Sequence, residues 1–211
     1  MINPNLVKKY TDDLPVETEA ILTARDSAAE SGLTPISPGT GAQLAVLAAS
    51  CRASSMLEVG TGTGVSGLWL LRGAPNATLT SIDLELEHQQ HARAAFQRQG
   101  IPATRARLIT GDAARVLPRM NEASYDLVFL DAGASQLLEQ VELSLTLVRV
   151  GGTVAVHNAM LGGRLADPAQ RGPEVSEMRA LISELAATDA VVSALSPIGG
   201  GLLQITRLSE H

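Results

Sequence analysis

The chain alternates between short apolar runs and longer stretches of helical spacing. From about residue 52 onward, each run is rich in Val, Ile, Leu or Ala, and most runs are followed by a stretch in which apolar residues recur every three or four positions. This alternation predicts parallel strands joined by crossover helices. The expected strands are 56–59, 77–82, 106–109, 127–130, 153–156, 191–195 and 202–205.

Helices are expected between these strands and ahead of the first one. The first helix is placed between the acidic pair Asp12 and Asp13, near its start, and Gly32, just past its end. The expected helices are 12–31, 40–51, 64–73, 85–99, 112–119, 135–148 and 174–187. In the fourth of these, the helical spacing predicts a buried face made of Leu86, Ala94, Ala95 and Phe96.

The last two apolar runs are separated by the glycine-rich segment 197–201, which predicts an antiparallel pair at the end of the chain. The whole pattern predicts an α/β class protein with a doubly wound, Rossmann-like fold, in which a seven-stranded sheet carries a terminal antiparallel hairpin. We expect a single domain over 1–211, with a helical extension over about 1–51 and the seven-stranded core over about 52–211.

Composition narrows the functional classes. With 16 Lys and Arg against 22 Asp and Glu, the formal net charge is −6, so the chain lacks the basic surface that nucleic-acid binding needs. A single cysteine, Cys51, excludes an internal disulfide and fits a reducing compartment. No stretch approaches the roughly 20 apolar residues that span a bilayer, and the first residues lack the apolar run of a signal peptide. We expect a cytoplasmic protein that acts on a small molecule, without a nucleic-acid or membrane partner.

Candidate chemistry gathers where the strands end. In an open α/β sheet, ligands bind outside the carboxyl ends of the strands, where the strand order reverses. Glycines at these positions permit tight turns, and the helix that follows offers free backbone N–H groups. The residues at these ends are Glu58 with glycines 60, 62 and 64, then Asp83, Asp112, Asp131, and the pair His157–Asn158.

Two cofactor classes fit a glycine-rich turn of this kind. The segment from Gly62 to Gly67 matches the dinucleotide fingerprint G-x-G-x-x-G, with Asp83 near the distance of a ribose-binding acid. The register favours another cofactor, because the strand stops at Val59 and the first glycine after it is Gly60. Charge points the same way, since a pyrophosphate is repelled by a mouth ringed with carboxylates. S-adenosylmethionine carries a sulfonium and an ammonium against one carboxylate, and this net cation suits such a mouth.

These residues together resemble the catechol and caffeoyl-coenzyme A O-methyltransferase-like family, which includes the bacterial family 3 O-methyltransferases. The similarity covers nearly the whole chain, and its main segments are 37–44, 58–66, 82–83, 125–132, 162–164 and 197–202. The resemblance implies a class I methyltransferase fold and transfer of a methyl group from S-adenosylmethionine to a hydroxyl of a small phenolic or catechol-like molecule. It also implies a divalent metal in most members and a homodimer.

The resemblance also implies roles for individual residues. Gly60 and Ser66 are expected near the methionine end of the cofactor, Asp83 at the ribose hydroxyls, and the backbone of Asp112 and Ala113 at the adenine. The full expected cofactor-binding set is Ile36, Glu58, Gly60, Thr61, Gly62, Gly64, Ser66, Asp83, Leu84, Asp112, Ala113 and Asp131. The expected catalytic residues are His157 and Asp131, and the corresponding metal set is Asp131, His157 and Asn158.

Departures from the family pattern fall on the catalytic half. The family places an Asp-Asn pair where this chain has His157-Asn158, and a lysine base where it has Ala134. Aromatic residues make up only 2% of the chain, so the aromatic gate that often holds a phenol is thin. Three mechanisms stay open: His157 acts as base, a metal activates the hydroxyl, or solvent deprotonates an acidic substrate. A non-catalytic S-adenosylmethionine-binding protein is the alternative function, and a nicotinamide-dependent oxidoreductase is less favoured.

Simpler roles compete for several of these residues. Asp83 could cap the helix that follows it, Asp131 could be a turn residue, and His157 could be a neutral histidine bonded within the packing. His88 and His91 are spaced as neighbours on a helix, but no acid or cysteine completes a tetrahedral metal set, so we interpret them as a solvated face.

Overall fold

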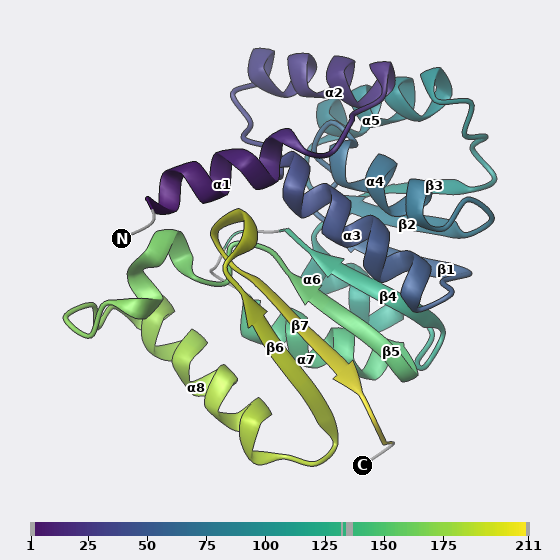
Figure 1. Cartoon of the computed structure of the whole chain (residues 1–211). Coiled ribbons are helices and arrows are strands. Elements are labelled where there is room, and N and C mark those ends of the chain that lie inside the picture. The colour runs from purple at the N-terminus through teal and green to yellow at the C-terminus, as the bar shows by residue number, and fades with distance from the viewer. Residues whose placement is uncertain (1–2, 132, 134–136, 210–211) are drawn as a thin grey trace.

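A computed structural model describes residues 3–131, 133 and 137–209, and its centre is a seven-stranded sheet in the order β3-β2-β1-β4-β5-β7-β6 (Figure 1). Strands β1 to β5 are parallel, and β7 runs antiparallel to both of its neighbours, β5 and β6. The strands are β1 (Ser55–Val59), β2 (Thr78–Asp83), β3 (Ala106–Thr110), β4 (Tyr125–Leu130), β5 (Val148–Val156), β6 (Val191–Ser196) and β7 (Leu202–Arg207). The predicted doubly wound α/β fold with a terminal antiparallel pair is confirmed.

Helices cover both faces of this sheet. In the described residues they are α1 (Pro4–Asp13), α2 (Glu19–Glu30), α3 (Pro38–Ser50), α4 (Val65–Gly73), α5 (Leu86–Arg98), α6 (Ala113–Val116), α7 (Leu137–Leu147) and α8 (Pro173–Ala187). Short 3-10 turns are η1 (Leu117–Arg119), η3 (Leu161–Ala166) and η4 (Ile198–Gly200). The expected helix over 112–119 is thus a single turn of α-helix that continues as η1.

Alternating side chains of the central strands divide the core into two layers. Leu127 and Phe129 of β4 pack with buried residues of α2, α3, α4 and α5 on one face. Val128 and Leu130 of the same strand pack with α6, α7 and α8 on the other face (Figure 1). Because successive strand residues point to opposite faces, an unbroken apolar run such as residues 127–130 of β4 indicates burial on both sides.

The strand order reverses between β1 and β4. From β1 the chain moves outward through β2 and β3, and then returns to add β4 and β5 on the opposite side of β1. The carboxyl ends of β1 and β4 therefore diverge into helices on opposite faces, which leaves a crevice between them. This crevice is where the candidate site lies.

The predicted first helix over 12–31 is wrong: two helices occupy this region. Helix α1 ends at Asp13 and α2 begins at Glu19. Pro15, in the break between them, has no backbone N–H to continue a helix, and the Thr18 hydroxyl caps α2 by accepting a hydrogen bond from the N–H of Ile21 at 3.4 Å. Asp12 therefore belongs to the end of α1, and its carboxylate accepts a hydrogen bond from the backbone of Gly39 on α3 at 3.1 Å.

The predicted buried face of the helix near 85–99 is half wrong. Leu86 is 59% exposed and Ala94 is exposed, whereas Ala95 and Phe96 are buried as expected. The other buried positions are Ala92 and Gln89, a polar residue that hydrophobicity alone assigns to the surface. Its amide is satisfied, because Nε2 donates to the Ile109 carbonyl at 2.6 Å and Oε1 accepts from Thr110 at 2.8 Å.

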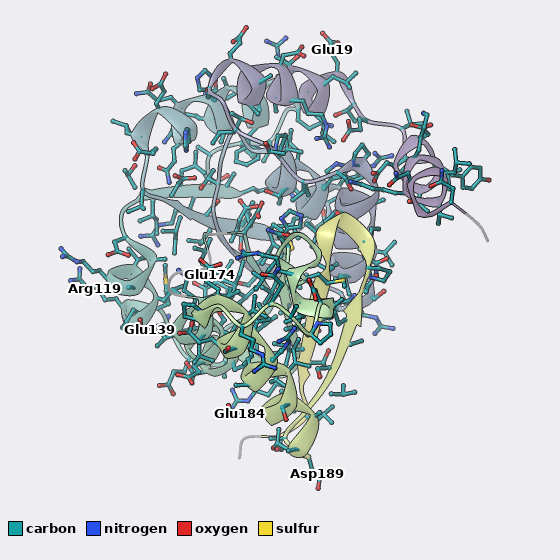
Figure 2. The ribbon with its side chains drawn as sticks, turned by 90° about the vertical axis from the view of Figure 1, so that its left-hand side faces the viewer. Glu19, Arg119, Glu139, Glu174, Glu184 and Asp189 are labelled. Atoms are coloured by element: carbon teal, nitrogen blue, oxygen red, sulfur yellow. The ribbon has the colours of Figure 1, made fainter. Side chains whose placement is uncertain are left out.

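Acidic side chains extend from the outer surface of the α7 and α8 layer. Figure 2 shows Glu139 on α7, Glu184 on α8 and Asp189 beyond the end of α8, and all three are exposed. None of the helices in the described ranges has the length and apolar character that a membrane crossing requires.

Candidate active site

A cavity of about 430 Å³ opens at the carboxyl ends of β1, β2 and β4. Its volume lies in the range of small-molecule sites. The expected cofactor residues that line it are Ile36, Gly60, Thr61, Gly62, Ser66, Asp83, Leu84, Asp112, Ala113 and Asp131. The two expected residues outside this lining are Glu58 and Gly64.

Glycine is required in the turn after β1 by two close approaches. Gly60 has φ +94°, and a Cβ there would lie 2.4 Å from the backbone oxygen of Asp131. Gly64, the N-cap of α4, has φ +92°, and a Cβ there would lie 3.0 Å from the Cα of Ala92 on α5. The first glycine brings the ends of β1 and β4 together, and the second lets α4 pack against α5.

Asp83 ends β2 and faces the glycine turn. Its Oδ2 accepts a hydrogen bond from the N–H of Gly62 at 2.8 Å, and its Oδ1 accepts one from the N–H of Glu85 at 3.0 Å. The carboxylate thus holds the segment between β2 and α5 and also lines the cavity. It does not cap α5, whose N-cap is Glu85. Its Oδ2 has a further lone pair for a ligand.

His88 does not lie on a solvated face, and this interpretation is wrong. Its side chain is 21% exposed and lines the cavity, and its Nδ1 lies 3.3 Å from Oδ1 of Asp83. The helical spacing to His91 concealed this contact, because the partner lies at the end of the preceding strand rather than on the helix. His88 is therefore a site residue that the sequence analysis missed.

Glu58 lies in the core directly below the glycine turn. Its Oε2 accepts a hydrogen bond from Ser81 at 2.5 Å, and Ser81 also contacts the Thr61 hydroxyl at 2.7 Å. Complete burial raises the pKa of Glu58 from 4.5 to about 7, and the negative charges of Asp131 and Asp83 add to this rise. The hydroxyls of Ser66 and Ser81 oppose it.

One oxygen of this carboxyl is unpaired. Among the described residues, Glu58 Oε1 is buried without a hydrogen-bond partner of normal geometry. The Ser66 hydroxyl is close enough to lower the pKa of Glu58, and Ser66 itself lines the cavity. Glu58 does not itself line the cavity, and its role as a cofactor-binding residue stays a prediction.

The adenine side of the cavity, by expectation, lies at the start of α6. Asp112 is the N-cap of this short helix, and its Oδ1 accepts a hydrogen bond from the N–H of Ala114 at 3.0 Å. Both Asp112 and Ala113 line the cavity, and their contact with adenine through the backbone stays a prediction.

Asp131 and His157 form a close pair at the ends of β4 and β5. Asp131 Oδ1 lies 2.7 Å from His157 Nδ1. The imidazole is largely buried, with 14% of its side chain exposed, while Asp131 is 28% exposed. The other ring nitrogen faces η4: a Cβ on Gly199 would lie 3.3 Å from Nε2 and 2.0 Å from the Thr40 hydroxyl. The two predicted catalytic residues thus lie in contact.

Asn158 has other partners. It has φ +52°, and its Oδ1 accepts a hydrogen bond from the N–H of Gly162 at 3.2 Å. Since Asp131 and His157 bind each other and the Asn158 oxygen is engaged, these side chains as they lie do not form an open set of metal ligands. Within the described ranges, no cluster of three or more His, Cys, Asp and Glu has a metal-binding arrangement. The three-residue metal set stays a prediction, and Ala134, at the expected lysine position, lies outside the described residues.

The sequence analysis missed a further wall of the cavity. Ala28 of α2 and the segment 33–36 line it opposite the end of β2, and Thr63 donates a hydrogen bond to the Ala24 carbonyl of α2 at 2.7 Å. Only Ile36 of this wall was expected. No sequence signal identifies the others, because their position depends on how the N-terminal helices pack on the core.

Comparison with known proteins places this geometry in a family context. A family model described as O-methyltransferase matches residues 18–208. A Mycobacterium marinum protein named "Putative O-methyltransferase" is 43% identical over 203 residues, which cover 96% of this chain and 91% of that protein. A crystal structure from Corynebacterium glutamicum is similar, with a TM-score of 0.89, 30% identity and 98% coverage of both chains. The O-methyltransferase TomG of Streptomyces achromogenes, involved in tomaymycin synthesis and solved with SAM, has a TM-score of 0.86, 28% identity and coverage of 99% and 100%.

Proposed function

The chain belongs to the O-methyltransferase family, and on this premise we propose that it transfers a methyl group from S-adenosylmethionine to a hydroxyl of a small phenolic or catechol-like molecule. One observation carries this proposal: the acidic cavity at the ends of β1 and β2 lies next to the Asp131–His157 pair. Asp131 belongs to both, since it lines the cavity and contacts the imidazole.

The lining suits S-adenosylmethionine in charge as well as size. Asp83, Asp112 and Asp131 line the cavity, Glu58 lies beneath it, and its described lining contains no Lys or Arg. A net cation is favoured in such a site, whereas a dinucleotide pyrophosphate would meet carboxylates without a compensating base. We propose that Asp83 binds the ribose hydroxyls, that the Asp112–Ala113 backbone binds the adenine, and that Gly60 and Ser66 contact the methionine end.

When bound, S-adenosylmethionine supplies an electrophilic methyl group on a sulfonium. The chain's own part is to orient the hydroxyl oxygen in line with that methyl and to remove the proton. Asp131 fixes His157 by accepting a hydrogen bond from Nδ1–H, which leaves Nε2 as the proton acceptor. The carboxylate then stabilises the imidazolium. Positioning of the two reactants supplies much of the rate.

The acceptor is proposed to bind between His157 and the small residues of α3 and η4. A Cβ on Gly199 would lie 3.3 Å from Nε2 and 2.0 Å from the Thr40 hydroxyl, and a Cβ on Gly200 would lie 3.0 Å from Oδ1 of Asn158. The absence of a side chain at both glycines keeps this side of the imidazole free of bulky groups. We infer that base catalysis by His157 proceeds without a metal, in keeping with the bond that already joins it to Asp131.

We also propose a homodimer with α1 at the interface. Large apolar side chains are exposed along α1 and the segment after it, including Leu6, Tyr10, Leu14 and Val16 at 64%, 67%, 61% and 78% exposure. Val192 on the edge strand β6 is 56% exposed. We therefore propose that the final hairpin also contributes to the dimer interface. One catalytic domain, a cytoplasmic location and the absence of a nucleic-acid partner complete the proposal, the last supported by the net charge of −6.

A methyl-transfer assay against small phenols and catechols, read by mass spectrometry, tests this function. We expect a product about 14 Da heavier than the acceptor (CH₃ in place of H, a net gain of CH₂), at a rate that survives EDTA because the base is an imidazole. Activity abolished by EDTA and restored by Mg²⁺ would instead establish the family's metal mechanism. Binding of S-adenosylmethionine without transfer to any hydroxyl would favour the non-catalytic alternative.

A further inference from the structure

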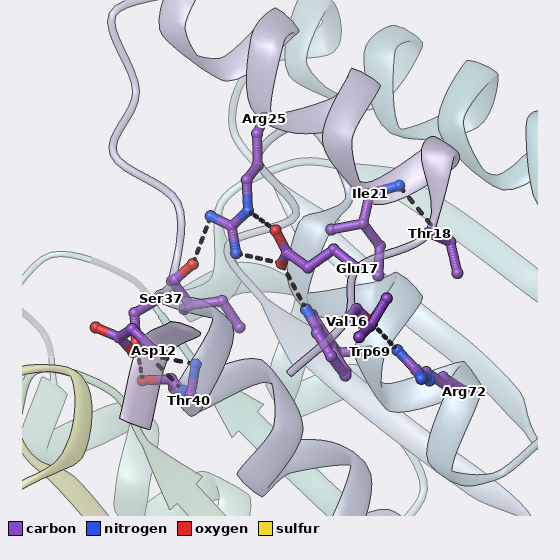
Figure 3. Close-up of polar contacts among 12 residues, drawn as sticks. Asp12, Val16, Glu17, Thr18, Ile21, Arg25, Ser37, Thr40, Trp69 and Arg72 are labelled. Atoms are coloured by element: carbon purple, nitrogen blue, oxygen red, sulfur yellow. Dashed lines mark hydrogen bonds and ion pairs between the residues drawn. The ribbon is translucent and has the colours of Figure 1, made fainter. Parts of the chain in front are cut away.

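A buried ion pair joins the N-terminal helices to the core near the cavity. Glu17 lies in the link between α1 and α2, with 8% of its side chain exposed, and Arg25 lies on α2 with 21% exposed. The guanidinium meets the carboxylate with two bonds, Nε to Oε2 and Nη2 to Oε1, each of 2.7 Å (Figure 3). Such a bidentate pair fixes both side chains in one geometry.

The third donor of this guanidinium reaches the wall of the cavity. Arg25 Nη1 donates a hydrogen bond to the Ile36 carbonyl at 2.8 Å. Ile36 is 1% exposed and lines the cavity together with the residues just before it, 33–35. Immediately after it, Ser37 begins the cap of α3. The guanidinium therefore holds the C-terminal end of the 33–36 segment, which follows α2 in the chain.

The carboxylate of the pair reaches a second wall. Trp69 of α4 donates from Nε1 to Glu17 Oε1 at 3.2 Å (Figure 3). Its ring is in close contact with α3, since a Cβ on Gly41 would lie 2.3 Å from the indole. Helix α4 begins with Val65 and Ser66, which line the same cavity as the 33–36 segment. Glu17 thus lies between the two walls, bonded to an element of each.

We propose that Arg25 and Glu17 are positioning residues that set cofactor affinity by holding the 33–36 segment in its binding conformation. Neither side chain lines the cavity, so both act through Ile36 and Trp69. A wall that must be ordered at the moment of binding costs affinity, and a wall held beforehand does not. The inference rests on the proposed assignment of this cavity to S-adenosylmethionine.

The test is calorimetric titration of S-adenosylhomocysteine into wild type and Arg25→Lys, which keeps the charge but loses the three-donor fork. If the segment is competent only a tenth of the time in the variant, the apparent Kd rises about tenfold. The matched control is Arg179→Ala, which removes a guanidinium that bonds the carbonyls of Leu165, Asp167 and Gln170 on a loop of η3 and α8. We expect this control to lower the melting temperature and leave Kd within about twofold of wild type.

Fluorescence supplies a readout that a merely structural role would not move. Trp69 is the single tryptophan of the chain, so its emission reports on the network directly. We expect S-adenosylhomocysteine to change this emission in wild type and to change it far less in Arg25→Lys at saturating ligand. Equal Kd and equal emission changes in wild type and Arg25→Lys would overturn the inference alone. Failure of wild type to bind S-adenosylhomocysteine would overturn the cofactor assignment, and this inference with it.

Discussion

The two halves of the crevice are built in different ways. After β1 and β2, the backbone itself forms the site: glycines at positive φ bring the turn against its neighbours, and Asp83 is fixed by backbone N–H groups. After β4 and β5, the site consists of one side-chain pair, Asp131 and His157, enclosed by loops from α3 and η4. The first half is a rigid binding frame, whereas the chemistry of the second half depends on which side chains occupy it.

The difference gives a physical reason for the departures that the resemblance implies in the second half. Changing the first half requires a new backbone path, because a Cβ at Gly60 would lie 2.4 Å from a main-chain oxygen. The second half can change one side chain at a time, as the histidine at position 157 illustrates. We therefore expect mutations to separate binding from chemistry, and the following tests are arranged from the largest expected effect to the smallest.

Replacing the imidazole tests the second half most strongly. In His157→Ala, methyl transfer should fall about 10²–10⁴-fold, the usual range for a lost general base. The Kd for S-adenosylhomocysteine, measured by calorimetry, should stay close to that of wild type, because His157 does not line the cavity. A matched loss of cofactor affinity would show that the two halves are not separable.

Glu58 links the binding frame to stability. Burial raises the pKa of Glu58 in the folded state to about 7, above its ordinary value of 4.5, so between these two pH values the folded state holds a proton that the unfolded state has released. Stability contributed by the proton is present below pH 4.5 and is lost as pH rises through about 7. Glu58→Gln should remove this loss, and its free energy of unfolding should exceed that of wild type by up to about 3 kcal/mol at pH 8 (one pKa unit being about 1.4 kcal/mol).

The control for this pH dependence is Asp126, a carboxylate whose pKa is shifted in the opposite direction. Burial of Asp126 alone would raise its pKa, but the N–H groups of Ser54 and Ser55 and the Arg149 guanidinium hold it below its usual value. This stabilisation is present above the unfolded pKa and is lost as pH falls through the folded one. Denaturant unfolding at pH 5 and pH 8 distinguishes the two residues. Asp126→Asn should have a lower free energy of unfolding than wild type at both pH values. A Glu58→Gln variant whose free energy of unfolding does not exceed that of wild type at pH 8 would contradict the assigned burial effect.

Asp83→Ala tests the binding frame at a single side chain. Loss of charge-assisted hydrogen bonds to the ribose should cost about 1.5–3 kcal/mol, or a 10- to 150-fold rise in the Kd for S-adenosylhomocysteine. Thermal shift gives an independent reading, since a ligand that binds only the folded state raises its melting temperature. If Asp83→Ala binds as tightly as wild type, the ribose assignment is incorrect.

The binding frame could be predicted from the sequence and the second half only in part. Strand, glycine turn and helix follow one another within ten residues around Gly60, so local pattern is sufficient to place them. The contact between Asp131 and His157 required knowledge that β4 and β5 are neighbours, which the resemblance supplied. That these two side chains bond each other, rather than serving as two separate metal ligands, depends on side-chain geometry that the spacing of residues does not encode.

The errors have two physical origins. The helix predicted over 12–31 took the acidic pair Asp12 and Asp13 as its start and gave too little weight to the local signals of Pro15 and the Thr18 cap. His88 was assigned to solvent because its partner, Asp83, belongs to another element. The Glu17–Arg25 pair gave no signal, because its importance comes from tertiary contacts with Ile36 and Trp69. Tertiary packing decided the last two cases.

A crystal structure of the protein with S-adenosylhomocysteine tests the central claim most directly. The account predicts ligand density in the cavity bounded by Gly60, Asp83 and Asp112, with the ribose against the Asp83 carboxylate. It also predicts that the sulfur end points toward Asp131 and the neighbouring His157. Density for the ligand in another cavity, or a ribose without contact to Asp83, would contradict the assignment of this crevice to the methyl donor.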